Sequence, residues 1–314
     1  MRILVTGGVG FIGHNVVRLL EKDHEVVSYD SETNYCGSIP DREIIELVHS
    51  RKSRIGSKSI YGDIRDQHNL SSVLGIVRPD TIVHLASYPR QKTVSDSPVT
   101  AADVMITGLV RVLENCKAYG ISKFVFISSS MIYGDFDNGT TEEAIGKPTG
   151  QYGVLKYAGE QLVRDFCNTK GINYVIIRPS AVYGEYDVND RVIAKFLTTA
   201  IKGGEIKVRG STEILDFTHV NDTAAGIALA TTTKVPSGSI FNITRSGVPY
   251  TLLDAARMAV EIAGNGTIVC TEKDDAFPSR GILCIDHARR LLNYNPTINL
   301  YDGLTQYHNW LISK

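Results

Sequence analysis

A glycine-rich turn close to the N-terminus constrains the fold of this chain more than any other feature. Gly7, Gly10 and Gly13 follow the apolar run Ile3–Val5 and precede an amphipathic stretch that begins at His14. This order predicts a strand, a tight turn and the start of a helix, whose free N–H groups suit a pyrophosphate. Glycine turns occur for many reasons, so the prediction needs a second signal.

That second signal is an acid at the end of the next predicted strand. The run Glu25–Tyr29 ends at Asp30, about 20 residues beyond the glycines, where a carboxylate accepts hydrogen bonds from ribose hydroxyls and repels a 2′-phosphate. The pattern therefore predicts a dinucleotide site that prefers NAD to NADP. The residues expected to line it here are Gly7, Gly10, Phe11, Ile12, Gly13 and Asp30.

Strands and helices then alternate through the first half of the chain. Predicted buried strands cover residues 81–86, 123–128 and 173–178, with helical stretches between them. Such alternation predicts an α/β fold with a Rossmann-like, doubly wound parallel sheet, whose ligands bind beyond the carboxyl ends of the strands.

The periodicity is less regular beyond residue 180. Helices are predicted over 191–202 and 251–263 and a strand over 205–209, whereas the run 239–243 is typical of a strand returning to the main sheet. We therefore predict an NAD-binding Rossmann domain over residues 1–178, with returning segments near 213–243. Residues 179–314 are predicted to form a smaller, interleaved lobe that binds the substrate.

Composition excludes several classes of protein. The chain has 314 residues and a formal net charge of −1, so it carries no basic footprint for nucleic acid. The most basic patch, Arg51–Arg54, is expected to be a solvated loop. No window is apolar enough to span a membrane, and the first residues already form a strand in place of a signal peptide. Five scattered cysteines without CxxC spacing and eight histidines without an HExxH motif predict no disulfide and no metal site, and favour the cytoplasm.

The candidate chemistry lies in a serine, a tyrosine and a lysine. Ser129 follows the predicted strand 123–128, and Tyr152 and Lys156 share one face of a predicted helix because they are four residues apart. A phenol has a pKa near 10, and we expect the ammonium group and a positive nicotinamide ring to lower it. This trio predicts a general acid/base that exchanges a proton with a substrate hydroxyl while hydride moves to or from NAD.

With these motifs in order, the chain resembles an extended short-chain dehydrogenase/reductase of the nucleotide-sugar epimerase/dehydratase family over nearly its whole length. The segments that carry the resemblance are Thr6–Gly13, Asp30, Gly62–Ile64, His84–Ser87, Ser129–Gly134, Tyr152–Lys156, Arg178–Gly184, Asp216–Asp222 and Asn293–Pro296.

The resemblance implies roles for several residues. Tyr152 is the expected catalytic base, Lys156 is expected to hold the nicotinamide ribose, and Ser129 to assist at the substrate hydroxyl. Further cofactor contacts are expected at Asp63 and Ile64, beside the adenine edge, and at Leu85, Ala86 and Ser87. An ordinary turn is the alternative interpretation of residues 62–64.

Two positions next to Ser129 discriminate between reactions in the family. Dehydratases carry an Asp-Glu pair where this chain has Ser130 and Met131, and neither of these side chains can eliminate water from a sugar. We expect both residues beside the sugar, with Met131 as a packing residue. The leading hypothesis is an NAD-dependent nucleotide-sugar epimerase of the UDP-glucose/UDP-galactose 4-epimerase type. The alternatives are a nucleotide 4-keto-sugar reductase, a dehydratase and an inactive NAD-sensing protein.

The substrate contacts depart from the family pattern. Ala181 stands where asparagine is common, and Leu215 where an arginine contacts phosphate. Arg191 and Arg280 are candidates to bind the diphosphate in compensation, and surface pairing with a local acid is the alternative for each. UDP is the expected nucleotide by analogy alone. The resemblance also implies a homodimer through the helices that follow Gly108 and Tyr152.

Overall fold

A seven-stranded parallel sheet forms the centre of the molecule. The computed structural model describes residues 1–188, 190–274 and 277–314. The strands stand in the order β11-β6-β5-β4-β1-β2-β3, and each neighbouring pair is parallel. Their bounds are β1 (Arg2–Thr6), β2 (Glu25–Asp30), β3 (Lys58–Tyr61), β4 (Thr81–His84), β5 (Lys123–Ile127), β6 (Asn173–Pro179) and β11 (Ser239–Ile243). This topology confirms the predicted Rossmann-like fold class.

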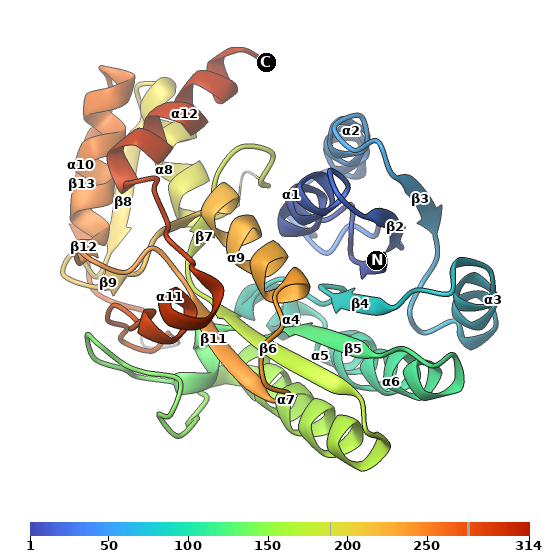
Figure 1. The fold of residues 1–314 in the computed structure, drawn as a ribbon. Helices are drawn as coiled ribbons and strands as arrows, with labels where there is room; N and C mark the ends of the chain where they lie inside the picture. The colour runs from blue at the N-terminus through green and yellow to red at the C-terminus, as the bar shows by residue number, and fades with distance from the viewer. Residues whose placement is uncertain (189, 275–276) are drawn as a thin grey trace.

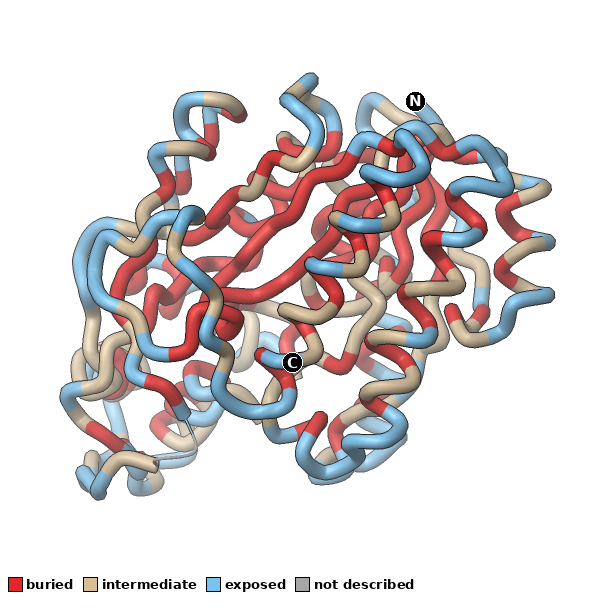
Figure 2. Tube along the Cα trace, turned by 90° about the horizontal axis from the view of Figure 1, so that it is seen from below, coloured by how far each residue is buried: buried red, intermediate tan, exposed pale blue. Residues whose placement is uncertain are grey.

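Helices cover both faces of the sheet, which explains why its strands are apolar on both sides. One face is covered by α3 (Gln67–Val77), the π-helical turn η1 (Asp103–Gly108), α6 (Leu109–Ala118) and α7 (Gly150–Lys170). The other face is covered by α1 (Phe11–Leu20), α9 (Val220–Thr232) and α11 (Asp286–Leu292). Figure 2 shows the result, in which the strands run as buried segments through the centre.

A second core lies beyond one end of the sheet. Apolar residues of α8 (Val192–Ile201), α10 (Leu252–Ala263) and α12 (Leu300–Ile312) pack there against β8 (Glu205–Arg209). In Figure 1 these helices gather on the side of the molecule opposite α3. Strand β8 pairs with β13 (Thr267–Thr271), β9 (Ile214–Leu215) with β12 (Tyr250–Thr251), and β7 (Val182–Tyr183) with β10 (Thr218–His219). We call this part, with the loops around it, the small lobe.

The two parts of the chain interleave. Strand β11 pairs with β6, and α9 packs against α1, although both follow α8 in the sequence. The chain therefore leaves the main sheet after β6 and returns to it. The division at residue 178 remains a prediction.

Two local expectations were wrong. The strand predicted over 81–86 ends at His84, because β1 beside it ends at Thr6 and offers no further partner. The patch Arg51–Arg54 is not a solvated loop: α2 (Asp41–Lys52) includes its first half, and Arg51 is buried. The remaining helices are the short α4 (Gln91–Asp96), α5 (Pro98–Ala102) and the 3-10 turn η2 (Ser130–Tyr133).

Candidate functional site

One cavity of about 370 Å³ lies at the carboxyl ends of the central strands, between the sheet and the small lobe. Its lining brings together every residue that the sequence assigns to a site: Gly7, Gly10, Phe11, Ile12, Gly13, Asp30, Asp63, Ile64, Leu85, Ala86, Ser87, Ser129, Ser130, Met131, Tyr152, Lys156, Arg191 and Arg280. Segments that are remote in sequence therefore meet around one space.

The glycine turn forms the floor of this cavity and has no room for side chains. Gly7 has a φ of +71°, and a Cβ atom there would lie 2.7 Å from the Ala86 nitrogen. A Cβ atom on Gly13 would lie 2.0 Å from the Gly7 carbonyl oxygen. Helix α1 begins after Gly10 without a side-chain cap, so its first N–H groups face the cavity as an anion site. The turn therefore fits a dinucleotide pyrophosphate.

Asp30 is held at the end of β2 by two backbone donors. Its Oδ2 accepts a hydrogen bond from the Val9 N–H over 2.9 Å, and its Oδ1 accepts one from the Glu32 N–H over 2.8 Å. Burial raises the pKa of Asp30, whereas these hydrogen bonds act to lower it. A carboxylate has about four acceptor sites, so two remain for the hydroxyls of a ribose. This geometry fits NAD.

Asp63, by contrast, is already paired. Its carboxylate accepts hydrogen bonds from the Arg65 side chain, the shortest over 2.7 Å, and from the Arg65 backbone N–H over 2.8 Å. The contact with the adenine edge remains a prediction, since Asp63 lines the cavity with part of its acceptor capacity in use.

The candidate acid/base trio converges where β5 ends and α7 begins. Lys156 Nζ donates to the Ile127 carbonyl oxygen over 2.8 Å and lies 5.9 Å from the centre of the Tyr152 ring. Ser129 caps η2, where its Oγ accepts a hydrogen bond from the Met131 N–H over 3.2 Å. The hydroxyl hydrogen of Ser129 is thereby left for another acceptor.

The electrostatics of this trio differ from the expectation. Burial raises the pKa of Tyr152, and the opposing influences are a hydrogen bond with Ser129 and the charge of Arg191. Burial also lowers the pKa of Lys156 to about 7. The sequence predicts that the Lys156 ammonium group, together with a nicotinamide ring, lowers the pKa of Tyr152, but with a pKa of about 7 the desolvated lysine is only partly charged near neutral pH. The missed influence is Arg191, which reaches this point from the small lobe.

Ser130 and Met131 occupy η2 and are nearly inaccessible. The Ser130 hydroxyl donates to Ser180 Oγ over 3.0 Å, so its hydrogen is committed to a protein partner. Met131 packs into the core below the cavity, and its Sδ lies 3.9 Å from Arg280 Nη1. Neither side chain supplies a carboxyl group beside Ser129.

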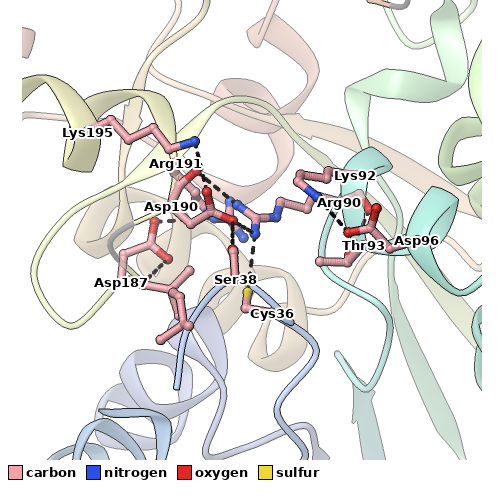
Figure 3. Close-up of polar contacts among 12 residues, drawn as sticks. Cys36, Ser38, Arg90, Lys92, Thr93, Asp96, Asp187, Asp190, Arg191 and Lys195 are labelled. Carbon is pink, nitrogen blue, oxygen red and sulfur yellow. Dashed lines mark hydrogen bonds and ion pairs between the residues drawn. The ribbon is translucent and has the colours of Figure 1, made fainter. Parts of the chain in front are cut away.

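The two candidate arginines differ in their pairing. Arg191 occupies the N-cap position of α8 without a side-chain capping bond, and its Nε lies 3.3 Å from Asp187 Oδ2. Figure 3 shows the two side chains side by side. Arg280 has no carboxylate within ion-pair distance among the described residues. Burial lowers the pKa of Arg280 to about 10, which still leaves it charged at neutral pH. Arg280 is therefore the better placed of the two to receive an anion.

The two departures from the family pattern have different structural consequences. Ala181 lines the cavity with a φ of +39°, a left-handed conformation that alanine adopts only with strain. Leu215 packs in the core of the small lobe and does not line the cavity. No polar side chain replaces either of them at its own position.

Sequence reasoning missed several cavity residues. Gln91 Oε1 accepts a hydrogen bond from the Tyr152 N–H over 3.0 Å, which fixes the start of α7. The rings of Tyr35 and Tyr88 lie 4.4 Å apart, and both line the cavity, as does Phe277. Tyr88 and Gln91 could have been predicted as cavity residues, because they follow the carboxyl end of β4, where ligands of such sheets bind. No comparable sequence pattern indicates Phe277.

Arg51, which was expected in solvent, also lines this cavity. Its Nε and Nη2 donate to the Tyr186 carbonyl oxygen over 3.0 and 2.6 Å. Burial lowers its pKa to about 10, and the charges of Asp187 and Asp30 oppose that shift. The Tyr186 carbonyl oxygen and the carboxylates of Asp187 and Asp30 explain why the charged Arg51 can be buried here.

Two further searches of the described residues gave no candidate. They contain no group of three or more His, Cys, Asp or Glu side chains arranged to hold a metal ion. No helix among them is long and apolar enough to cross a membrane.

Comparison with known proteins identifies the family. The model of the family described as "NAD dependent epimerase/dehydratase family" matches residues 3–244. An uncharacterized UDP-glucose epimerase of Bacillus subtilis is 29% identical, over 100% of this chain and 98% of its own length.

Solved structures of similar proteins include different enzymes. UDP-glucuronic acid 4-epimerase from Bacillus cereus, in complex with UDP-glucuronic acid and NAD, is 28% identical with a TM-score of 0.89, over 100% of this chain and 99% of that one. The dTDP-glucose 4,6-dehydratase of Streptomyces venezuelae, with NAD bound, is 26% identical with a TM-score of 0.87, over 100% and 97%. A family model that spans most of the chain, a shared fold and a cavity that fits NAD lead to one conclusion: the chain belongs to the NAD-dependent epimerase/dehydratase family.

Proposed function

We propose that this protein is an NAD-dependent nucleotide-sugar 4-epimerase, with UDP-glucose and UDP-galactose as its first candidate substrates. The observation that carries the proposal is the convergence of Ser129, Tyr152 and Lys156 on a cavity whose neighbouring positions, Ser130 and Met131, have no carboxyl group. Proton exchange at a sugar hydroxyl is thus supported, whereas elimination of water lacks its acid and base.

The chain's own groups would act as follows. Tyr152 takes the proton of the sugar C4 hydroxyl and later returns it, and Ser129 hydrogen-bonds the same oxygen. Lys156, held by the Ile127 carbonyl oxygen, orients the nicotinamide ribose and stabilises the phenolate when it is protonated. A bound NAD would supply a reversible hydride acceptor for C4, and the 4-keto sugar would turn over in the cavity so that the hydride returns to its opposite face.

The substrate diphosphate is assigned to Arg280 and Arg191. A guanidinium group binds a phosphate oxygen pair through charge-assisted hydrogen bonds, and both side chains line the cavity. Contacts on the diphosphate alone leave the hexose free to present either face to NAD, as 4-epimerisation requires.

UDP-glucuronic acid is the second candidate substrate. It is the ligand of the Bacillus cereus enzyme, and the Arg280 guanidinium lies beside Met131, the residue expected next to the sugar. A cation without an acidic partner among the described residues suits a sugar carboxylate as well as a phosphate.

Incubation with a panel of UDP-, GDP-, CDP- and dTDP-sugars tests the proposal. Interconversion of UDP-glucose and UDP-galactose, with no external NAD consumed, is the expected result. Interconversion of UDP-glucuronic and UDP-galacturonic acids alone would select the second candidate. Stoichiometric oxidation of added NAD(P)H by a keto sugar would show a reductase, and loss of water from dTDP-glucose a dehydratase.

We also propose that the protein is a homodimer through α6 and α7. On α7, Leu162 and Phe166 are only partly buried against the core, and Val154 is 49% exposed. Equilibrium sedimentation tests this, and a monomer at micromolar concentration contradicts it.

A further inference from the structure

An ion pair between Arg90 and Asp190 joins the small lobe to the main domain at the rim of the cavity. Arg90 lies just before α4, and Asp190 lies just before Arg191, the N-cap residue of α8. The Arg90 guanidinium pairs with the Asp190 carboxylate and also donates to the Asp190 carbonyl oxygen over 3.1 Å. Figure 3 shows the two side chains meeting between the segments that carry them.

The same pair holds a third segment, the loop that follows β2. Arg90 Nη2 donates to Cys36 Sγ over 3.2 Å, and the Ser38 hydroxyl donates to Asp190 Oδ2 over 3.2 Å. Cys36 and Arg90 both line the cavity, whereas Asp190 and Ser38 lie behind them. One small polar cluster therefore ties together the loop after β2, the loop after β4 and the segment before α8.

These three segments lie around the place where the dinucleotide fits. The loop from Asp30 to Cys36 lines the cavity from the ribose acid outward, and Ser87 to Arg90 line it from the end of β4. A dinucleotide seated on the glycine turn and Asp30 is thus enclosed by segments that Asp190 connects.

The Arg90–Asp190 ion pair is shielded from solvent, whereas the Lys92–Asp96 ion pair on α4 is exposed. The side chains of Arg90 and Asp190 are 17% and 9% exposed, whereas those of Lys92 and Asp96 are 56% and 53% exposed. Removing one partner of a shielded ion pair costs more than breaking an exposed pair, because the remaining charge is poorly solvated. Asp190 Oδ1 also pairs with Lys195 Nζ over 2.9 Å, so the Asp190 carboxylate ties Arg90 to α8 as well. Separating the small lobe from the main domain at the cavity rim therefore requires breaking the Arg90–Asp190 ion pair.

We propose that the Arg90–Asp190 pair is a clasp that slows the release of bound NAD, so that the cofactor stays with the chain between turnovers. Both residues are positioning residues, because they act through the segments that they join. The proposal rests on the use of NAD and is independent of which sugar the protein converts.

The experiment measures release of radiolabelled NAD from the loaded full-length protein after addition of excess unlabelled NAD. We expect Asp190→Asn and Arg90→Met each to release NAD about tenfold faster or more. The matched control is Lys92→Gln, because Lys92 lies two residues from Arg90 and its ion pair with Asp96 is exposed. The Lys92→Gln variant should release NAD at the wild-type rate.

The double variant Arg90→Met/Asp190→Asn identifies the contact itself. If the two side chains act through one contact, the double variant releases NAD no faster than the faster single variant. Multiplied effects, or release rates equal to that of the wild type in both single variants, would overturn the clasp.

A measurement on the wild-type protein covers the case in which a variant fails to fold. Hydrogen exchange should show that amides of residues 31–38 and 185–188 become protected when NAD is added. Absence of that protection would also overturn the proposal. A failure of the sugar panel leaves both measurements unaffected, because they follow NAD alone.

Discussion

The two sides of the cavity are built in different ways. On the cofactor side, Gly7 and Asp30 lie at the ends of the neighbouring strands β1 and β2, and Gly13 lies in the first turn of α1. Backbone atoms make the decisive contacts there. On the substrate side, Arg191 and Arg280 come from loops of the small lobe and act through long side chains.

The difference shows what each side can vary. A Cβ atom at Gly13 or Gly7 meets backbone atoms, so the glycine turn tolerates no side chain at either position without movement of the chain. The small lobe departs from the family pattern at Ala181, which lines the cavity, and at Leu215, which packs in the lobe's core, and the fold is kept at both positions. Backbone atoms thus shape the cofactor side, whereas the substrate side is shaped by side chains.

The largest expected effect is a loss of turnover, without a loss of NAD binding, when Tyr152 is replaced. Tyr152→Phe removes the proton acceptor and should lower kcat by about 10³-fold while NAD still binds. Tyr157→Phe, on the same helix, is the matched control and should keep near wild-type turnover. Steady-state kinetics together with NAD titration measure both quantities, and unchanged turnover in Tyr152→Phe would remove this residue from the mechanism.

The next effect tests the rigidity of the glycine turn. Gly13→Ala places a Cβ atom 2.0 Å from the Gly7 carbonyl oxygen. We expect about 100-fold weaker NAD binding, because overpacking against backbone forces the turn to shift. Gly75→Ala is the control, since its Cβ atom meets only Tyr119 at 3.5 Å. Calorimetric titration with NAD measures the change, and wild-type affinity in Gly13→Ala would contradict the contrast between the two sides.

A smaller effect is expected on the substrate side. Arg280→Met removes a partly buried cation and should raise the KM for the nucleotide sugar about tenfold, with NAD affinity unchanged. Arg290→Gln, an exposed arginine on α11, controls for the loss of charge. If Arg280→Met weakens NAD binding instead, the assignment of Arg280 to the substrate side is wrong.

The last prediction concerns acid stability and two buried histidines of the main domain, His14 and His84. Burial lowers the pKa of His14 and His84 to about 3. The unfolded chain takes up protons near pH 6.5 and the folded chain does not, so stability falls as the pH drops from 6.5 toward 3. Each imidazole contributes at most about 1.4 kcal/mol per pH unit in this window.

Urea unfolding between pH 7 and 5 measures that slope. His14→Gln should reduce it, and His68→Gln, an exposed position on α3, controls for the loss of a surface imidazole. An unchanged slope in His14→Gln would place the acid sensitivity elsewhere.

The regular elements followed largely from the sequence. Strands β8 and β11 have the predicted bounds, and α10 begins where Thr251 and Asp254 form a capping box. These features depend on local periodicity and local hydrogen bonds, which neighbouring residues determine. The end of β4 did not follow, because the length of its partner β1 decided it.

The sequence indicated many of the residues that line the cavity, but it did not indicate their partners or their burial. The glycine turn, Asp30 and the spacing of Tyr152 and Lys156 are local patterns, so each was visible in the sequence. The burial of Arg51 was not, since the Tyr186 carbonyl oxygen that receives it lies far along the chain.

The sequence by itself determined the strand, turn and helix that receive NAD, because glycine conformations and a four-residue helical spacing are properties of the local backbone. Only the tertiary structure decided the charge state of the site, since the pKa of Lys156 reaches about 7 through burial by the whole fold. It also decided the Arg90–Asp190 contact, which exists because the small lobe folds back over the loop that follows β4.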